Sequence, residues 1–350
     1  LVLPPRTGKT LTSLATSLLI DAERTLIVCP ALARRVWARE INKWLRETRV
    51  VLITGRGANE LQVMCQVCGG TRYVDNKPCT ECAWRGKPRG FIPRVVNYLT
   101  PKPVDGMPDK SRFVCRKHKS EPILADKGSK VRCKHCLTEL VDLMRWAKYA
   151  IVNYDCLVTQ QRVAADGRKE ADSLLPGAIP LIGSVRFDLA IGDEIHYIRG
   201  WQSGSKRLGS TRRERFNQAC DLIPRVIGLT ATPIYGFIRD LWGQFDAVSA
   251  GAVSGKPDRL PFSFHRYFCD GHKDAYGWVA NGRTDEADTE LPQRMKTFVR
   301  IRTRDEIAMQ LPVKRRQIIQ IEPDKPVVYQ FRKGDNAESK FSRMVSAALS

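Results

Sequence analysis

The sequence lacks the features of membrane, fibrous and repeat proteins. Its 350 residues contain no apolar run close to the about 20 residues that span a bilayer. The N-terminus has no basic stretch leading into a signal-type apolar segment, and neither an internal repeat nor a low-complexity tract is present. With 43% hydrophobic and 27% charged residues, the chain has the composition of a folded protein with a sizeable core. We therefore expect a soluble, intracellular protein, cytoplasmic or nucleoid-associated, with no membrane partner.

Acidic residues are few: 37 Asp and Glu accompany 58 Lys and Arg, and the formal net charge is +21. Such an excess attracts polyanions, mainly DNA or RNA, although a ribosome-adjacent or membrane-surface protein would share it. The 11 cysteines could indicate a disulfide scaffold, but most of them have the spacing of metal ligands. We therefore expect a reducing compartment.

Apolar runs and helical periods alternate over much of the chain. Helical spacing predicts a helix after the loop PPRTGKT, with Leu11, Leu14 and Leu18 among its apolar positions, and another helix over 31–45. Short apolar runs predict strands at 1–3, 25–30, 49–55, 149–155, 186–194 and 225–232. This alternation indicates an α/β fold, a parallel sheet with helices on both faces.

The alternation stops between residues 56 and 148, where prolines, glycines and paired cysteines replace the long apolar periods. This stretch carries 19 Lys and Arg against 9 Asp and Glu. The chain also begins without methionine and ends inside a charged stretch, so we expect a fragment of a longer protein. The predicted organisation is a first lobe in two parts, 1–55 and 149–325, an inserted module at 56–148, and the start of a linker at 326–350.

The loop before the first predicted helix has the composition of a phosphate-binding loop. In PPRTGKT, Lys9 would neutralise phosphate oxygens, the Thr10 hydroxyl would bind Mg²⁺, and backbone N–H groups would surround a phosphate. The full GxxxxGK[ST] pattern fails at its first glycine, because Leu3 stands there, and a solvated helix start is the alternative. The predicted nucleotide-binding residues are Arg6, Thr7, Gly8, Lys9, Thr10 and Leu11.

Two later strand ends carry polar clusters that fit the same site. Asp193 and Glu194 follow the apolar run FDLAIG, so Asp193 can hold Mg²⁺ while Glu194 orients and deprotonates the attacking water. Thr230, Ala231 and Thr232 follow another strand, and their hydroxyls can switch hydrogen-bond partners when a γ-phosphate leaves. An isolated acidic turn or a plain turn would be the alternative reading of each cluster alone.

The cysteines of the insertion predict two structural zinc sites. The spacing CxxC allows two sulfurs from one turn to reach the same tetrahedral Zn²⁺ ion. The expected ligands are Cys65, Cys68, Cys79 and Cys82 for one ion and Cys115, His118, Cys133 and Cys136 for the other, with VRCKHC forming a strand that leads into the last pair. Crossed pairing, for example of Cys65 and Cys68 with Cys133 and Cys136, stays open. The remaining cysteines are expected to be buried thiols.

Basic residues around the cysteines, together with aromatic ones, could grip phosphates and stack on bases, or they could form a solvated or protein-docking surface. The run from Arg199 to Arg215 predicts a flexible basic loop that contacts phosphates, with plain solvent exposure as the alternative; its basic residues include Lys206, Arg207, Arg212, Arg213 and Arg215.

Taken in order, these segments resemble the motifs of superfamily 2 helicases, and within them the Swi/Snf-like double-stranded DNA translocases. The resemblance rests on PPRTGKT (motif I), LIVCPALARRVWAREINKW (Ia), VVLITG, YAIVNYDCL (Ib/Ic), FDLAIGDEIHYIRG (II) and GLTATPIYGFIRDLWGQF (III). RYFCDG and MKTFVRIRTRDEIAMQLPVKRRQ are similar to the segment that closes the first lobe in that branch. The likeness covers most of residues 1–320 outside the insertion. It implies a RecA-like P-loop NTPase lobe that carries an inserted pair of zinc ribbons.

The resemblance also implies a function and assigns residues to it. The chain would be the N-terminal ATPase lobe of an ATP-dependent DNA translocase, of DEAH-box type, with ATP, Mg²⁺ and two structural Zn²⁺ ions as cofactors. Its partners would be double-stranded DNA and a second RecA-like lobe. Catalysis would involve Lys9, Asp193, Glu194 and His196; His196 and the segment 230–232 would couple hydrolysis to DNA; and the DNA backbone would meet Arg34, Arg35, Asn153, Lys206 and Arg207.

The chain also departs from the family pattern. Arg6 stands where the family loop often has glycine, and the adenine-recognising segment and the second lobe with its arginine fingers are not in this sequence. An arginine finger contributes about 10³–10⁵ in rate, so we expect weak ATP hydrolysis or none by this chain alone. The alternative is a non-hydrolysing nucleotide- or nucleic-acid-binding module tethered by its zinc ribbons. An RNA helicase or restriction-type motor is disfavoured by the segment around LPVK.

Overall fold

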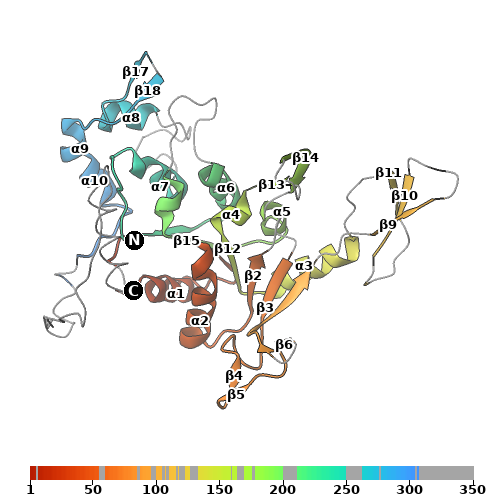
Figure 1. Ribbon diagram of the computed structural model, residues 1–350. Helices are drawn as coiled ribbons and strands as arrows, with labels where there is room; N and C mark the ends of the chain where they lie inside the picture. Colours follow the sequence, from red (N-terminus) through yellow and green to blue (C-terminus); the bar gives the residue numbers. More distant parts are fainter. Residues whose placement is uncertain are drawn as a thin grey trace, which may run out of the picture. The chain divides into compact units, whose positions relative to one another are not determined.

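A computed structural model shows the architecture of the chain (Figure 1). It describes residues 1–4, 7–54, 60–84, 87–95, 100–104, 107, 110–115, 117, 123–126, 133–158, 160–163, 169–175, 178–199, 211–249, 262–275, 277–303 and 306. Internal contacts divide the chain into Leu1–Arg304 and Asp305–Ser350. All elements described below belong to the first of these units, and the domain boundaries expected from the sequence stay predictions.

A sheet with the strand order β16-β15-β1-β12-β2-β3-β8 forms the centre of this unit. Its parallel part consists of β1 (Thr25–Cys29), β2 (Val50–Thr54), β12 (Tyr149–Asn153), β15 (Leu189–Asp193) and β16 (Val226–Leu229). Strands β1, β2 and β12 are buried over their whole length, as expected for near-continuous apolar runs covered on both faces. The predicted α/β fold with a parallel sheet is confirmed.

Two strands of the insertion extend this sheet in the antiparallel direction, which the sequence did not predict. They are β3 (Glu60–Met64), which pairs with β2, and β8 (Phe91–Val95), which pairs with β3. Only residues 55–59 separate β2 from β3, and antiparallel pairing is the geometry that so short a connection allows. The insertion is therefore part of the main sheet at one edge.

The rest of the insertion consists of small hairpins, a small sheet and one helix. The hairpins are β4 (Tyr73–Val74) with β5 (Lys77–Pro78) and β6 (Ala83–Trp84) with β7 (Lys87–Pro88). The small sheet contains β9 (Thr100–Pro103), β10 (Lys110–Val114) and β11 (Ile123–Asp126), and the helix is α3 (Lys134–Trp146). The sequence reading missed α3, whose buried Cys136, Leu140 and Met144 repeat every four residues.

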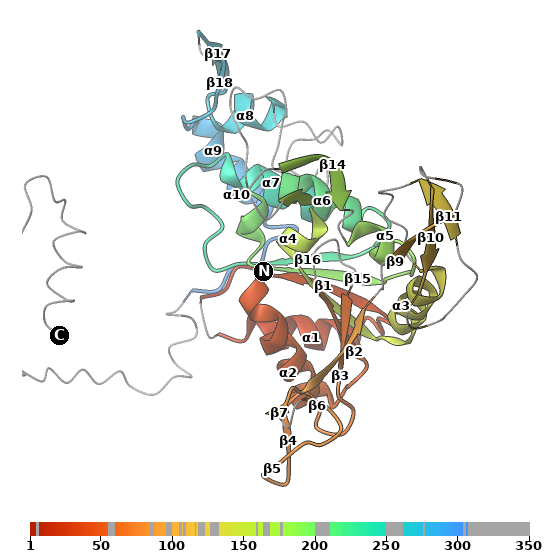
Figure 2. The same ribbon diagram turned by 45° about the vertical axis from the view of Figure 1, so that its right-hand side comes forward.

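Helices cover both faces of the sheet (Figures 1 and 2). On one face lie α1 (Lys9–Leu19), the short η1 (Ala31–Ala33) and α2 (Arg34–Leu45), which share a core with Ile27 and Cys29 of β1. On the other face lie α3, α4 (Tyr154–Leu157), α5 (Ile179–Ile182) and α6 (Thr211–Cys220), which share a core with Leu26 and Val28. The alternation along β1 follows the pleat of the strand.

The two helices predicted near the N-terminus are confirmed, but their buried faces are narrower than the apolar pattern suggests. In α1 the buried residues are Ser13, Leu14 and Ser17, whereas Leu11, Leu18 and Leu19 are exposed. The Ser17 hydroxyl satisfies its buried position by a 2.9 Å hydrogen bond with the Tyr149 hydroxyl. In α2, Trp37 and Ile41 are buried, while Trp44 is 47% exposed.

Beyond β16 a third apolar cluster forms around Trp242, Phe264 and Phe268. The elements of this region are α7 (Asp240–Val248), α8 (Phe262–Phe268), β17 (His272–Asp274), β18 (Gly277–Val279), α9 (Asp285–Thr289) and α10 (Leu291–Met295); η2 (Ile195–Ile198), β13 (Gln160–Val163) and β14 (Lys169–Leu175) complete the list. The strand predicted at 1–3 is reduced to Val2, which bridges Thr230 and Ile301. Among the helices in the described ranges, none has the length and apolarity to cross a bilayer.

Candidate functional site

The loop before α1 places Lys9 at the first position of the helix. Gly8 caps the helix with φ +91°, a left-handed conformation that favours glycine, and a Cβ added there would meet no atom within 4 Å. The first turn of α1 contains no acidic residue. The start of α1 therefore presents backbone N–H groups beside open space, an arrangement suited to an anion.

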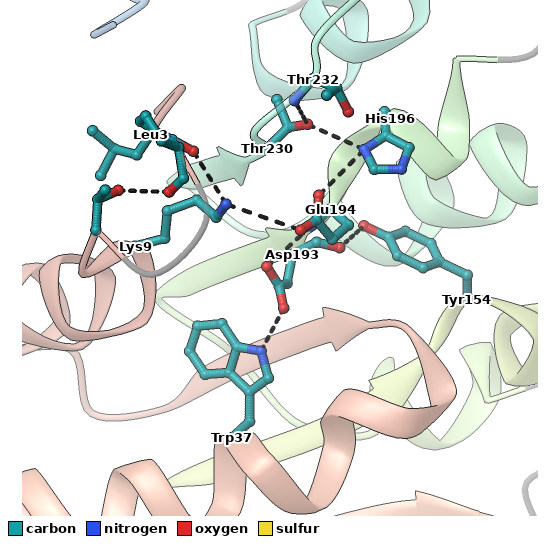
Figure 3. A network of polar contacts seen from close by, with 11 residues as sticks. Leu3, Lys9, Trp37, Tyr154, Asp193, Glu194, His196, Thr230 and Thr232 are labelled. Atoms are coloured by element: carbon teal, nitrogen blue, oxygen red, sulfur yellow. Dashed lines mark hydrogen bonds and ion pairs between the residues drawn. The ribbon is translucent and has the colours of Figure 1, made fainter. Parts of the chain in front are cut away.

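The Lys9 side chain reaches across to the end of β15 (Figure 3). Its Nζ donates a hydrogen bond to the Leu3 carbonyl oxygen at 3.2 Å and lies 3.9 Å from Glu194 Oε1. The positions of Lys9 and Glu194 are 185 residues apart in the sequence. The parallel sheet brings them together because β15 ends at the same edge of the sheet from which α1 starts.

Asp193 and Glu194 take different orientations although they are neighbours. Asp193 ends β15, and Glu194 has φ +50°, a left-handed conformation that turns the chain sharply after the strand. The Glu194 N–H donates to Asp193 Oδ1 at 3.1 Å, and the indole Nε1 of Trp37 donates to Asp193 Oδ2 at 2.8 Å. The Asp193 carboxylate therefore receives hydrogen bonds at both oxygens, while Glu194 faces Lys9.

The two carboxyl groups also differ in acidity. Burial raises the pKa of Asp193, and the hydrogen bond from Trp37 opposes that rise. The hydrogen bond with His196, followed by the charge of Lys9, lowers the pKa of Glu194 despite its partial burial. Glu194 is consequently an ionised carboxylate at neutral pH, poised between a cation and an imidazole.

His196 connects this acidic pair to the end of β16. Its Nδ1 lies 3.3 Å from Glu194 Oε2 and shares a 3.1 Å hydrogen bond with the Thr230 hydroxyl. The Thr230 hydroxyl oxygen also accepts a hydrogen bond from the backbone N–H of Thr232 at 3.1 Å. A continuous polar path therefore runs from Lys9 through Glu194 and His196 to the segment 230–232 (Figure 3).

Two residues at this site were not assigned to it from the sequence. Trp37 belongs to the helix predicted over 31–45 but received no role at the site, and neither did Tyr154, whose hydroxyl donates to the Asp193 carbonyl at 2.9 Å. The sequence could predict that Trp37 needs a hydrogen-bond acceptor, because a buried indole N–H is normally paired. Which acceptor it finds depends on the contact between α2 and β15.

The predicted nucleic-acid residues fall into different environments. Arg34 donates from Nε to the Ala31 carbonyl at 3.2 Å and from Nη1 to the Ile53 carbonyl at 3.4 Å. Arg35 is exposed, with its guanidinium carbon 5.7 Å from the centre of the Phe91 ring. Asn153 is 6% exposed, and its Oδ1 has no hydrogen-bond partner among the described residues. Arg6, Lys206 and Arg207 lie outside the described residues.

The expectation of a flexible basic loop up to Arg215 is wrong for its last part. Residues 211–220 form α6, where Arg212 pairs with Asp155 at 2.7 Å and Arg213 is 5% exposed with its guanidinium carbon 4.1 Å from the centre of the Trp242 ring. Charge alone did not distinguish a loop from a helix here, because long basic side chains can pack on aromatic rings and pair with carboxylates.

The first cysteine group is brought together at the end of β3. The sulfurs of Cys65, Cys68, Cys79 and Cys82 all lie within 4.8 Å of one another and all four residues are buried. The Gly90 N–H donates to Cys82 Sγ at 3.1 Å, which suits a sulfur that carries negative charge. Four buried thiolates in a closed group are a donor set that Zn²⁺ prefers.

The second group contains Cys115, Cys133 and Cys136, again within 4.8 Å of one another and buried. His118, the fourth predicted ligand, lies outside the described residues. The strand predicted for VRCKHC is wrong at its end, because Cys133 caps α3 and Cys136 lies in its first turn. The crossed pairing is contradicted, since Cys65 and Cys68 group with Cys79 and Cys82. Of the remaining cysteines, Cys29, Cys220 and Cys269 are buried and Cys156 is half-buried.

Comparison with known proteins finds similarity to a curated protein and to solved structures, while no family model matches the chain. The SWI/SNF-related matrix-associated actin-dependent regulator of chromatin subfamily A-like protein 1 of Drosophila melanogaster is 26% identical over 138 residues, which are 39% of this chain and 16% of that protein. The Sulfolobus solfataricus SWI2/SNF2 ATPase core, solved in complex with dsDNA, is 14% identical with a TM-score of 0.45, and the alignment covers 88% of this chain and 40% of that one. The chain thus spans well under half of the length of either relative. In its motifs and in this sequence similarity, the chain resembles the Swi/Snf-like branch of the superfamily 2 helicases.

Proposed function

We propose that the chain is the first RecA-like lobe of an ATP-dependent DNA translocase, and that it binds ATP with Mg²⁺ at the start of α1. The observation that carries the proposal is the convergence of Lys9, Asp193 and Glu194 at one edge of the parallel sheet, with Lys9 Nζ 3.9 Å from Glu194 Oε1. Motif-bearing residues 185 positions apart in the sequence meet there, as a nucleotide site requires.

The residues present fit a triphosphate and its metal ion. Lys9 and the N–H groups at the start of α1 would hold phosphate oxygens, with a phosphate replacing Glu194 beside the ammonium group. The Thr10 hydroxyl and the Asp193 carboxylate would bind Mg²⁺, for which oxygen ligands are the ordinary choice. When bound, the metal ion neutralises charge that develops on the phosphate oxygens. Arg6, Thr7 and Leu11 complete the proposed nucleotide-binding segment.

Glu194 is the proposed general base. Its lowered pKa keeps it ionised, and its separation from the doubly hydrogen-bonded Asp193 leaves it able to orient a water molecule and accept a proton. The Nδ1 atom of His196 contacts both Glu194 Oε2 and the Thr230 hydroxyl, so a change at the γ-phosphate can reach the segment 230–232. This is the proposed coupling path to DNA.

Turnover and movement require a second RecA-like lobe, in the same or another chain. An arginine supplied in trans contributes about 10³–10⁵ in rate, so this chain alone would bind ATP and hydrolyse it slowly or not at all. The proposed substrate is double-stranded DNA held by its backbone, inside the cell. Two Zn²⁺ ions would have a structural role, since small cysteine-bound modules cannot bury enough apolar surface without metal.

Nucleotide binding by two lysine variants tests the proposal. We expect Lys9→Ala to weaken Mg²⁺-dependent ATP binding at least about 10-fold, in line with the loss of a charge-assisted contact. Lys43→Ala removes the same charge from an exposed position on α2 and should leave ATP binding unchanged. In the protein completed by its second lobe, Glu194→Gln should lower DNA-stimulated turnover by about 10²–10⁴.

Equal ATP binding by the wild-type chain and Lys9→Ala would contradict the nucleotide site. If neither chain bound ATP and both still bound DNA, the chain would be a nucleic-acid-binding module that does not use ATP.

A further inference from the structure

The described residues 65–84 and 87–91, which we call the cysteine knuckle, contain the first cysteine group and are held against α2 and the segment that follows it. Asn42 Nδ2 donates to the Gly69 carbonyl at 3.1 Å, and Gln66 is bound to Thr48 by hydrogen bonds of 2.6 and 2.9 Å. A Cβ on Gly69 would lie 2.3 Å from Asn42 Nδ2, so the contact leaves no room for a side chain. The knuckle and α2 therefore present one continuous surface, and their ribbons lie close together in Figure 2.

Three arginines from these two parts meet at one place on that surface. Gly70 and Gly90 are in such close contact that a Cβ on Gly90 would lie 2.5 Å from the Gly70 carbonyl oxygen. Arg72 and Arg89 lie within two residues of these glycines, and Arg35 extends from α2 to within 5.7 Å of the adjoining Phe91 ring. We call Arg35, Arg72 and Arg89 the arginine cluster.

The cluster is exposed, and its like charges repel one another. All three side chains are exposed, and in the described part of the chain no carboxylate lies within 4.0 Å of Arg35 or Arg72. After partial burial, the charges of Arg72, Arg34 and Arg89 lower the pKa of Arg35. Like charges held together destabilise the free protein, and an anionic partner relieves the repulsion.

We propose that the arginine cluster binds the phosphate backbone of DNA, so that the nucleic-acid surface expected at Arg35 extends onto the inserted knuckle through Arg72 and Arg89. This rests on the proposed DNA partner. Guanidinium groups bind phosphate oxygens in a bidentate geometry. The net charge of +21 favours a long polyanion such as DNA. An acidic protein segment is the competing partner. Because only backbone groups are contacted, binding through the cluster is independent of base sequence.

Salt dependence of DNA binding tests the cluster directly. The chain is titrated, without nucleotide, against a short fluorescein-labelled duplex of mixed sequence, and fluorescence anisotropy gives Kd at about 50 and 200 mM salt, a range over which each phosphate contact weakens binding about 3.5-fold. Loss of two contacts in Arg35→Ala/Arg72→Ala should therefore reduce the ratio of the two Kd values about 12-fold. The pair Arg72→Ala/Arg89→Ala leaves α2 intact and should act in the same way.

Matched variants separate this surface from total charge. Arg186→Ala/Arg225→Ala removes two exposed arginines that precede β15 and β16, and should leave the ratio of Kd values nearly unchanged. Arg35→Lys/Arg72→Lys keeps the charges and should retain most of the salt dependence. Zinc content and thermal unfolding of each variant, compared with the wild-type chain, confirm that the knuckle is intact.

The outcomes are distinct. A fall in the ratio for both cluster pairs, but not for the control pair, supports the proposal. Equal falls for cluster and control pairs overturn it, as does an unchanged ratio in the cluster variants, while DNA binding by the wild-type chain would still support the proposed function. If the variants lost only the binding of labelled polyglutamate, the partner would be an acidic protein. Absence of any DNA binding by the wild-type chain would overturn both proposals.

Discussion

The hydrogen bond from Trp37 to Asp193 gives the sharpest test of the nucleotide site. Trp37 is 1% exposed, and its Nε1 lies 2.8 Å from Asp193 Oδ2. Trp37→Phe keeps an aromatic ring in the core but removes the only N–H of the side chain. Asp193 Oδ2 then loses its donor inside the protein, where burial already raises the pKa of this carboxyl group.

Two separate costs can be estimated. An unsatisfied hydrogen bond to a charged group costs about 1.5–3 kcal/mol, which corresponds to a factor of about 10 to 150 in an equilibrium constant. If Asp193 is a Mg²⁺ ligand, this cost appears in Mg²⁺-dependent ATP binding, because the carboxylate is no longer held in one orientation by Trp37. The smaller ring leaves some empty space and lowers the free energy of unfolding by about 1 kcal/mol, which does not itself change binding.

The assay is a Mg²⁺ titration of ATP binding, followed with a fluorescent ATP analogue, on chains whose folding is checked by circular dichroism. Trp44→Phe is the matched control, because Trp44 lies on the same helix and its Nε1 donates to the Glu40 carboxylate, far from β15. We expect the Mg²⁺ midpoint to rise at least about 10-fold for Trp37→Phe and to stay unchanged for Trp44→Phe. A folded Trp37→Phe chain with the wild-type midpoint, or an equal effect of both variants, would refute the reasoning.

Four further predictions concern the metal, the core and the coupling path. Cys65→Ser should lower the zinc content from two ions per chain to one, measured by elemental analysis, and an unchanged content would contradict the first zinc site. His265 is fully buried, and burial, followed by nearby arginine charges, lowers its pKa from 6.5 to about 3. Below about pH 6.5 the unfolded chain takes up a proton at His265 that the folded chain does not, so the free energy of unfolding should fall as the pH drops. The expected loss is about 2 kcal/mol between pH 7.5 and 5. Urea unfolding should show this loss in the wild-type chain and much less of it in His265→Gln. Gly90→Ala places a Cβ on a residue with φ +75° and against the backbone of Gly70, so it should lower the free energy of unfolding by about 1–3 kcal/mol. Gly236→Ala should be nearly neutral, because an added Cβ there meets no atom within 4 Å. Equal effects of the two variants would show that the close approach at Gly90 is unimportant. Thr230→Val removes the hydroxyl between His196 and the following loop, so in the two-lobed protein ATP binding should persist while stimulation of turnover by DNA is reduced, and full stimulation would exclude this path.

Much of the fold could be predicted from the sequence, because it depends on local pattern. Short apolar runs identify β1, β2, β12, β15 and β16 without reference to their neighbours. The GKT loop and the Asp193–Glu194 pair follow or precede such elements directly, so their placement at one sheet edge follows from the parallel topology. CxxC spacing fixes which sulfurs are neighbours within a turn, though not which turns meet.

The tertiary structure alone decided the contacts that join distant segments. The antiparallel addition of β3 and β8, the grouping of Cys65 with Cys79, the pairing of Arg212 with Asp155 and the hydrogen bond between Trp37 and Asp193 all depend on which elements pack together. A residue type states what a side chain can donate, accept or bury, whereas its partner is set by the packing of the whole chain. For this protein the sequence determined the parallel core and its polar strand ends, and the folded structure decided how the insertion and α2 surround them.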